Sequence, residues 1–335
     1  MSYDIQLPES QSAVTLTEFG APEVLHYQTD VDVPKMGDKQ VLVKIAYASV
    51  NPVDYKTRQG LGWGADNIKN NQYANGKPAI LGFDMAGEVV ASNSQTFKVG
   101  DKVAALNFKG GCYAQYNVVD AELLAKVPDS VDLKTAGALP CVGLTAYQSI
   151  KFAFGMADIK SDDHVVMNAP AGGVGHLMVQ MLMQKVEQQG IKLTVICSPE
   201  KYKKLESLID TTKLAGWIDY TKEDDFPSLQ ADLLMDLVGN EAGVRALSVL
   251  KEQGQVVVLP SIWVDKLQQA GLNKNIKVKG FKANPNGEDL SDVLAMIESC
   301  EIKLHFQNTY PLAQAEQAHH EIEKGDSFGK IVLEL

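Results

Sequence analysis

The sequence predicts an α/β protein built from a β-rich antiparallel domain and a six-stranded, doubly wound parallel sheet. Three observations support this fold class. The first third of the chain carries short β-branched runs separated by Gly, Pro and Asp, strands and helices alternate from about residue 160 onward, and a glycine-rich turn opens that alternation. Regular alternation of strands and helices favours a parallel sheet covered by helices on both faces.

The β-rich domain is predicted from short apolar runs that are bounded by turn residues. These runs are "AVTLTEF" (13–19), "QVLVKIAYASV" (40–50), "MAGEVVA" (85–91) and "KVAAL" (102–106). No segment with helical periodicity interrupts most of this region, which indicates a compact antiparallel domain. The polar, Gly- and Asn-rich stretch at 60–78 is predicted to be a surface loop.

The pattern changes at Leu133, where residues 133–155 have the length and composition of a helix despite Pro140. Strands are then predicted at 164–169, 192–197, 216–220, 231–238, 254–260 and 276–281, and the helices between them include 199–209 and 242–254. Residues 290–335 follow as helix, strand, helix and strand. Because six strands already complete the parallel sheet, we expect this tail to return to the first domain.

The glycine-rich turn is "NAPAGGVGHLMVQ" (168–180), which follows an apolar strand and precedes a helix that ends at Gly190. The unit has the roughly 30-residue length of a βαβ dinucleotide-binding motif. Unpaired N–H groups at a helix start can bind a pyrophosphate if no Cβ blocks it. We expect Gly172 to allow this approach and Gly175 to let the helix pack on the strand. Pro170 stands where the usual motif has its first glycine, and a turn without a ligand is the alternative interpretation.

Composition excludes several classes of protein. The formal net charge of −11 disfavours binding to nucleic-acid backbones as a main role. No apolar run reaches about 18 residues, so no membrane span is expected, and the polar start of the chain predicts a cytoplasmic protein. The four cysteines are scattered without a CxxC pair, which predicts buried free thiols and no structural zinc.

Several motifs together resemble the zinc-independent quinone oxidoreductase (zeta-crystallin-like) family of the medium-chain dehydrogenase/reductase superfamily. They are "SVNPVDYKTRQG", "GFDMAGEVV", "FKVGDKVAAL", "GGCYAQY", "AGALPCVGLTAYQSI", "APAGGVGH" and "FGKIVLEL". The resemblance implies a GroES-like catalytic domain at 1–132 and 284–335, and a Rossmann NADP-binding domain at 133–283. It also implies NADPH in the cleft between the domains and a homodimer.

The chain departs from its relatives in two respects. Zinc-dependent relatives carry a Cys near the position of Asn51 and a His-Glu pair where this chain has Phe83 and Asp84, so no metal is expected. His319 and His320 are adjacent on a predicted helix and are expected to lie on a solvated face. Related reductases often have a tyrosine where this chain reads 60–63, "GLGW", so the source of the reaction's proton is open.

The resemblance also nominates site residues. Asn51 is the expected catalytic residue, because its amide would lie beside the nicotinamide and polarise the acceptor; the alternative is a turn residue before Pro52. Asp54 is expected to be a structural hydrogen-bond acceptor. The expected cofactor-binding residues are Asn51, Thr145, Gly172, Gly173, Val174, Gly175, Ser198, Lys201, Tyr220 and Lys330. The last of these would reach the phosphates or the nicotinamide ribose, or would be an exposed lysine at a strand start.

NADPH is expected rather than NADH, because the second strand of the parallel sheet ends without a carboxylate until Glu200. Ser198 leaves room for a 2′-phosphate, and Lys201 adds positive charge. The predicted function is therefore hydride transfer from NADPH to a quinone or an α,β-unsaturated carbonyl, a small electrophilic substrate. An enoyl-thioester reductase and a non-catalytic NADPH-binding sensor or interaction protein are the alternatives, and nucleic acid and membrane partners are not expected.

Overall fold

The computed structural model of the 335-residue chain describes residues 7–71, 73, 76–222 and 226–335. Contacts divide the chain into two compact units. The first unit comprises Met1–Cys141, Pro285–Ser299 and Leu304–Leu335, and the second comprises Val142–Asn284 and Cys300–Lys303. The tail returns to the first unit, as the sequence predicted.

The first unit is β-rich. Its strands are β1 (Ser10–Leu16), β2 (His26–Asp32), β3 (Gln40–Val50), β4 (Ala79–Ile80), β5 (Asp84–Ser92), β6 (Lys102–Leu106), β7 (Tyr116–Asp120), β8 (Leu124–Lys126), β15 (Phe306–Pro311) and β16 (Lys330–Glu334). Seven of them form one sheet in the order β15-β16-β3-β5-β6-β8, with β7 also paired to β3, and β2-β1-β4 form a smaller sheet. All pairs are antiparallel except β15 with β16.

Pairing between β3 and β16 joins the two ends of the first unit's sequence. Ile331 lies opposite Val50, so the residues that follow β3 and begin β16 become neighbours. Alternate residues of β3, namely Val41, Val43 and Ile45, are buried in the core of this unit, as expected for a strand with one face inward. This register positions the candidate site described below.

Among the described residues, five α-helices belong to this unit: α1 (Pro52–Arg58), α2 (Gly62–Asn71), α3 (Leu133–Ala138), α9 (Gly287–Glu298) and α10 (Ala315–Glu323). Over residues 62–71 the helix α2 corrects the prediction of a loop at 60–78, and residues 72, 74 and 75 of that stretch lie outside the described residues. Its Ala65 and Ile68 are buried and lie on one helical face at an i, i+3 spacing. Packing of this face outweighs the poor helix propensity of the Gly and Asn residues that suggested a loop.

The division between the units falls after Cys141, whereas the sequence prediction put it after residue 132. The difference arises because α3 packs against β3, β5 and β16 of the first unit. Gly137 of α3 lies close to β3, because a Cβ there would come within 2.7 Å of the Tyr47 carbonyl oxygen. The single helix predicted at 133–155 is therefore two helices, because α3 ends at Ala138 and α4 (Pro140–Ala157) begins at a proline.

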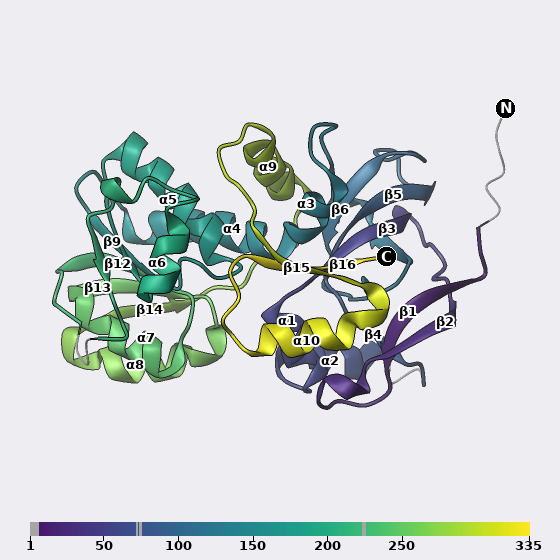
Figure 1. Ribbon diagram of the computed structural model, residues 1–335, viewed down its shortest axis with the longest axis horizontal. Coiled ribbons are helices and arrows are strands. Elements are labelled where there is room, and N and C mark those ends of the chain that lie inside the picture. The colour runs from purple at the N-terminus through teal and green to yellow at the C-terminus, as the bar shows by residue number, and fades with distance from the viewer. Residues whose placement is uncertain (1–6, 72, 74–75, 223–225) are drawn as a thin grey trace. The chain divides into compact units, whose positions relative to one another are not determined.

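The second unit is a six-stranded parallel sheet, as predicted, in the order β11-β10-β9-β12-β13-β14. The strands are β9 (His164–Asn168), β10 (Lys192–Ile196), β11 (Gly216–Ile218), β12 (Ala231–Asp236), β13 (Leu250–Val258) and β14 (Lys277–Gly280). Helices α4, α5 (Gly175–Gln189), α6 (Pro199–Leu205), α7 (Asn240–Ala246) and α8 (Val264–Gly271) accompany it (Figure 1). The predicted helix at 242–254 ends early, because residues from Leu250 onward pair with β12.

Strand order in this sheet reverses between β9 and β12, which are neighbours although two strands separate them in sequence. Ligands of open parallel sheets bind outside the carboxyl ends of the strands at such a reversal. The glycine-rich turn follows β9, so it lies at this edge of the sheet. In the part of the chain that the structure describes, no helix is long and apolar enough to cross a membrane.

Candidate functional site

A buried polar cluster surrounds Asn51, the first candidate residue. Asn51 lies between the end of β3 and the start of α1 and is 1% exposed. Its Nδ2 donates to Asp84 Oδ2 at 2.8 Å and lies 3.4 Å from Ser49 Oγ, and its Oδ1 accepts from Lys330 Nζ at 2.5 Å. The carboxamide is therefore fixed between an ammonium and a carboxylate, which also determines which of its ends is oxygen.

Lys330 is buried in this cluster, with only 2% of its surface exposed. Its ammonium donates to the Val50 carbonyl oxygen at 3.1 Å as well as to Asn51. Burial lowers the pKa of Lys330, and the Asp84 carboxylate opposes that shift. The lysine is thus not the exposed strand-start residue of the alternative interpretation, and its ammonium bonds with the protein's own Asn51.

The two carboxyl groups of the cluster differ in their partners. Asp84 accepts hydrogen bonds from Ser49 Oγ (2.6 Å), Asn51 Nδ2 and the Cys141 backbone N–H (2.8 Å). Asp54 accepts from the Asn51 backbone N–H at 2.7 Å, the structural role that the sequence predicted. Burial raises the pKa of both groups, and burial together with the nearby Asp84 raises that of Asp54 to about 8. Since Asp84 has more donors, Asp54 is the carboxyl group that holds a proton at neutral pH.

This proton makes the stability of the protein depend on pH. The pKa of Asp54 is about 8 when folded and 3.8 ordinarily, so between these values the folded state holds a proton that the unfolded state lacks. Its contribution is full below pH 3.8 and is lost as pH rises to 8. His319 has the opposite effect on stability, because burial and Arg58 lower its pKa from 6.5 to about 3. Its contribution is full above pH 6.5 and is lost as the pH falls toward 3.

We therefore expect the free energy of unfolding to fall between pH 6.5 and 8, where only Asp54 of these two groups contributes. Urea unfolding at several pH values measures this slope. The Asp54→Asn variant carries no titrating proton at this position and should show a flatter profile. An equally steep decline in that variant would assign the effect to another group.

The cluster does not fit a zinc ion. Its donor set consists of a hydroxyl, a carboxamide and two carboxyl groups, and the Lys330 ammonium already compensates the charge of Asp84. Zinc sites use Cys, His and carboxylate ligands around an open metal position. Among the described residues, the one group of three potential metal ligands is Glu23, Glu316 and His320, with ligand atoms within 4.8 Å of one another. It is formed by surface side chains, and none belongs to the Asn51 cluster.

Two glycines in the turn of the second unit differ in how much room their surroundings leave for a side chain. A Cβ on Gly175 would lie 2.0 Å from the Ala169 carbonyl oxygen, so only glycine allows α5 to begin this close to the end of β9. A Cβ on Gly172 would meet only that oxygen, at 3.6 Å. The backbone around Gly172, Gly173 and Val174 is half-buried and precedes the first turn of α5. The open space beside Gly172 leaves room for a dinucleotide phosphate, and its binding by these residues stays a prediction from the sequence.

Two strand ends beside this turn carry a polar pair that the sequence analysis missed. Asn168 ends β9 and donates through Nδ2 to Asp236 Oδ1 at 2.5 Å, at the end of β12. Asp236 is fully buried and also accepts from the backbone N–H groups of Val238 and Gly239. The pair ties the two strands together at the reversal of strand order. Both residues end apolar strands, which is the signal that could have identified them.

The remaining cofactor candidates also belong to the second unit. Ser198 precedes α6, and its Oγ accepts from the Lys201 backbone N–H at 3.4 Å. Tyr220 is 48% exposed, and its carbonyl oxygen accepts from Arg245. Thr145 is half-buried on α4. The end of β10 thus carries a small hydroxyl residue at a helix start, with no carboxylate before Glu200.

Three aromatic rings of the first unit lie close to one another. Trp63 on α2 lies 5.5 Å from the Phe83 ring and 4.4 Å from the Phe108 ring between centroids. Phe83 directly precedes Asp84 in the chain. The stretch that was predicted to be a loop therefore supplies an aromatic side chain at the position where related reductases often have tyrosine.

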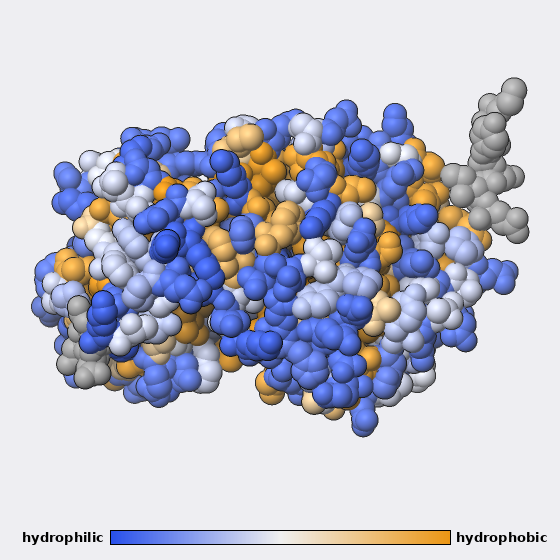
Figure 2. Space-filling view, in the orientation of Figure 1, coloured by the Kyte–Doolittle hydropathy of each residue, from blue (hydrophilic) through white to orange (hydrophobic). Residues whose placement is uncertain are grey.

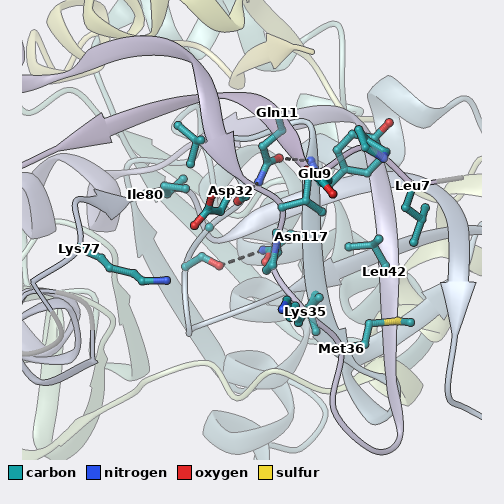
Figure 3. A pocket seen from close by; sticks show the side chains of 18 of the residues that line it. Leu7, Glu9, Gln11, Asp32, Lys35, Met36, Leu42, Lys77, Ile80 and Asn117 are labelled. Carbon is teal, nitrogen blue, oxygen red and sulfur yellow. Dashed lines mark hydrogen bonds between the residues drawn. The ribbon is translucent and has the colours of Figure 1, made fainter.

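A separate cavity of about 1480 Å³ opens in the first unit. Its lining includes the β1 and β2 edge and the turn at Gly110 (Figure 3). Acidic and basic side chains are mixed in it, and its buried Gln11 and Asn117 already bond with the backbone. None of the predicted site residues lines this cavity, so it is distinct from the Asn51 cluster.

The four cysteines are free, but only Cys112 and Cys197 are buried as predicted. Cys141 is half-buried and Cys300 is exposed. The latter adopts φ of 60° two residues after the end of α9.

Two domain families match the chain. Residues 37–129 match the alcohol dehydrogenase GroES-like domain, and residues 215–333 match the family described as zinc-binding dehydrogenase. Together with the six-stranded parallel sheet and the β-rich unit, these matches define a medium-chain dehydrogenase/reductase.

Similarity to individual proteins identifies the branch of this superfamily to which the chain belongs. The chain is 31% identical to 2-methylene-furan-3-one reductase of Solanum lycopersicum, covering 99% of this chain and 81% of that one. It is 30% identical to the chloroplastic NADPH-dependent alkenal/one oxidoreductase of Arabidopsis thaliana, with 98% and 81% covered. The solved structure of the quinone oxidoreductase from Coxiella burnetii superposes with a TM-score of 0.84 at 30% identity, covering 97% and 99%. The chain belongs to the quinone oxidoreductase-like branch of the medium-chain dehydrogenase/reductase superfamily.

Proposed function

We propose that this protein is an NADPH-dependent oxidoreductase that transfers hydride to a quinone or an α,β-unsaturated carbonyl compound without zinc. The observation that carries the proposal is the buried Lys330 ammonium bonded to Asn51. It fixes an ammonium donor beside the residue that we expect at the nicotinamide. The names of the relatives, an alkenal/one oxidoreductase, a furanone reductase and a quinone oxidoreductase, support the same class of acceptor.

A conjugated acceptor suits the chemistry of this cluster. Hydride adds to carbon, and the resulting negative charge spreads to an oxygen that a nearby positive group stabilises. NADPH, when bound, supplies the hydride from its nicotinamide ring. Alcohol oxidation instead requires loss of the hydroxyl proton, which zinc normally assists by acidifying the bound oxygen. Lys330 and Asn51 offer no comparable acidification.

The structure changes the role that we assign to Asn51. Its amide was expected to donate to the acceptor oxygen, but Nδ2 already contacts Asp84 and Ser49. We therefore assign Asn51 as a positioning residue that holds the Lys330 ammonium in place. Lys330 provides the ammonium donor, and its lowered pKa makes it a better proton donor than an exposed lysine.

The preference for NADPH over NADH rests on the end of β10. NAD-binding sheets place a carboxylate there for the ribose 2′-hydroxyl. This chain has Ser198 at the start of α6, with Lys201 in the first turn. A 2′-phosphate would find room and positive charge at this position rather than a repelling carboxylate.

An acceptor panel tests the proposed function. NADPH oxidation is followed with simple quinones, enones, an enoyl-thioester and, in the reverse direction with NADP+, primary alcohols. We expect kcat/KM for at least one conjugated acceptor to exceed that for every alcohol, and NADPH to be used more efficiently than NADH. Faster turnover of alcohols would contradict the acceptor class. Cofactor binding without turnover of any compound would favour the non-catalytic alternative.

A further inference from the structure

The buried side of α1 is entirely polar. Asp54, Thr57 and Arg58 are each 0% exposed, and their i, i+3 and i+4 spacing places them on one helical face. Charged residues are rarely this buried unless every polar atom has a partner. Here the partners are incomplete, which distinguishes this face from an ordinary structural network.

Five buried atoms at this location have no hydrogen-bond partner among the described residues. They are Asp54 Oδ1, Thr57 Oγ1, Arg58 Nε and Nη1, and His319 Nδ1. The set contains both donors and acceptors. Buried ordered water typically satisfies about three such groups at once, and unsatisfied polar atoms are otherwise costly. The proton on Asp54 also needs a hydrogen-bond acceptor. It lies on Oδ1, because Oδ2 accepts the hydrogen bond from the Asn51 backbone N–H.

Tyr113 and His319 continue this polar path inside the first unit. Both are 0% exposed, and the Tyr113 hydroxyl lies 3.2 Å from His319 Nε2. Burial raises the pKa of Tyr113. Helix α10, which carries His319, packs against α1, and Arg58 of α1 pairs with Glu323 one turn after His319. The His319 side of α10 therefore lies beside the polar face of α1. Burial and Arg58 keep His319 neutral, with its pKa lowered to about 3. A neutral imidazole has one donor and one acceptor nitrogen, so it can take up a proton on one side and release one on the other.

The path reaches the surface along α10. Glu323 follows His319 by four residues on this helix, forms an ion pair with Arg58, and has a side chain that is 26% exposed. The outer side of α10 is hydrophilic (Figure 2). The sequence prediction of a solvated face is therefore correct for His320 and wrong for His319, because adjacent positions of a helix point in directions about 100° apart.

We propose that Asp54, Tyr113, His319 and Glu323 form a buried proton relay, completed by ordered water, that leads from the protein surface to the Asn51 cluster. Each turnover of the proposed reaction moves a hydride to the acceptor and consumes one proton. Asp54 gives up its proton toward the Lys330 side of the cluster, and the relay returns one from solvent to Asp54 Oδ1. The role in turnover rests on the proposed function, whereas the relay itself can be tested without it.

The first test follows the Asp54 proton in the free protein by infrared spectroscopy. A protonated-carboxyl band should disappear as pH rises through about 8, be absent in Asp54→Asn, and shift on transfer to D2O. We expect Tyr113→Phe to slow this hydrogen–deuterium exchange by about 100-fold, the lower end of the effect of a positioned acid–base group. His319→Phe interrupts the same path at a second point.

Tyr55→Phe is the matched control, because Tyr55 is a half-buried tyrosine on α1 outside the path. It should exchange as the unmodified protein does. Equal exchange rates in Tyr113→Phe, His319→Phe and Tyr55→Phe would overturn the relay, as would absence of the carboxyl band from the unmodified protein.

The second test uses turnover with an acceptor that the unmodified protein reduces. With the relay interrupted in Tyr113→Phe, we expect kcat to fall and its solvent deuterium isotope effect to rise, while KM for NADPH stays unchanged. Unchanged isotope effects and pH profiles, with normal turnover, would contradict the relay but leave the proposed function intact. No turnover by the unmodified protein would instead contradict the proposed function.

Discussion

Replacement of Lys330 by methionine is expected to lower the free energy of unfolding at pH 7 by about 3–5 kcal/mol, the usual cost of leaving a buried charge without compensation. Methionine retains most of the side-chain volume but removes the ammonium. Asp84 then keeps a buried negative charge without compensation, and Asn51 Oδ1 and the Val50 carbonyl oxygen lose their donor. Urea unfolding monitored by circular dichroism measures the loss.

Two further variants separate this effect from a general loss of lysine. Lys44→Met changes an exposed lysine on β3 of the same sheet and should have little effect. Lys330→Met combined with Asp84→Asn removes both charges and should recover part of the stability, because no uncompensated charge remains. A loss in Lys330→Met no larger than in Lys44→Met would show that the ammonium is not part of a buried network.

The second large effect is expected in the glycine turn, where one substitution should lower stability and a neighbouring one should lower affinity for NADPH. In Gly175→Ala the new Cβ would lie 2.0 Å from the Ala169 carbonyl oxygen and 3.0 Å from two carbonyl carbons. Since these are backbone atoms, α5 must shift, at a cost of about 1–3 kcal/mol or more in stability. Thermal and urea unfolding would report this loss.

Gly172→Ala should leave stability nearly unchanged, because its Cβ would be in ordinary contact at 3.6 Å. If the dinucleotide phosphate approaches this backbone, however, the added methyl group occupies its place. We expect affinity for NADPH to fall at least about tenfold, which corresponds to about 1.4 kcal/mol. Calorimetric titration with NADPH measures this loss of affinity. A Gly172→Ala variant that binds NADPH as tightly as the unmodified protein would place the phosphate elsewhere.

Sequence patterns predicted those parts of the fold that depend on local periodicity. The six strands of the parallel sheet are apolar runs between turn residues, and Gly175 has the close contact that the βαβ pattern implied. Local patterns failed where packing decides the outcome. The residues of α2 have weak helix propensity, and burial of Ala65 and Ile68 makes them helical. The boundary after Cys141 follows from contacts of α3, which composition does not reveal.

The polar cluster could be predicted only in part. Asn51 and Lys330 were each nominated, but they are 279 residues apart and only the pairing of β3 with β16 brings them together. No sequence periodicity signals such a contact. The same holds for Tyr113 and His319, which bond across 206 residues. Long-range polar contacts depend on strand register and helix packing, and these become visible only in three dimensions.

The most direct test of the central claim is the fate of a deuterium label on the transferring position of NADPH. The protein is first treated with chelator and checked for metal, and an enone from the acceptor panel is then reduced with the labelled cofactor. We expect turnover to continue and the deuterium to be found on the β-carbon of the product, as direct hydride transfer without zinc requires. Turnover that stops on chelation and returns with zinc, or a product without the label, would contradict the account.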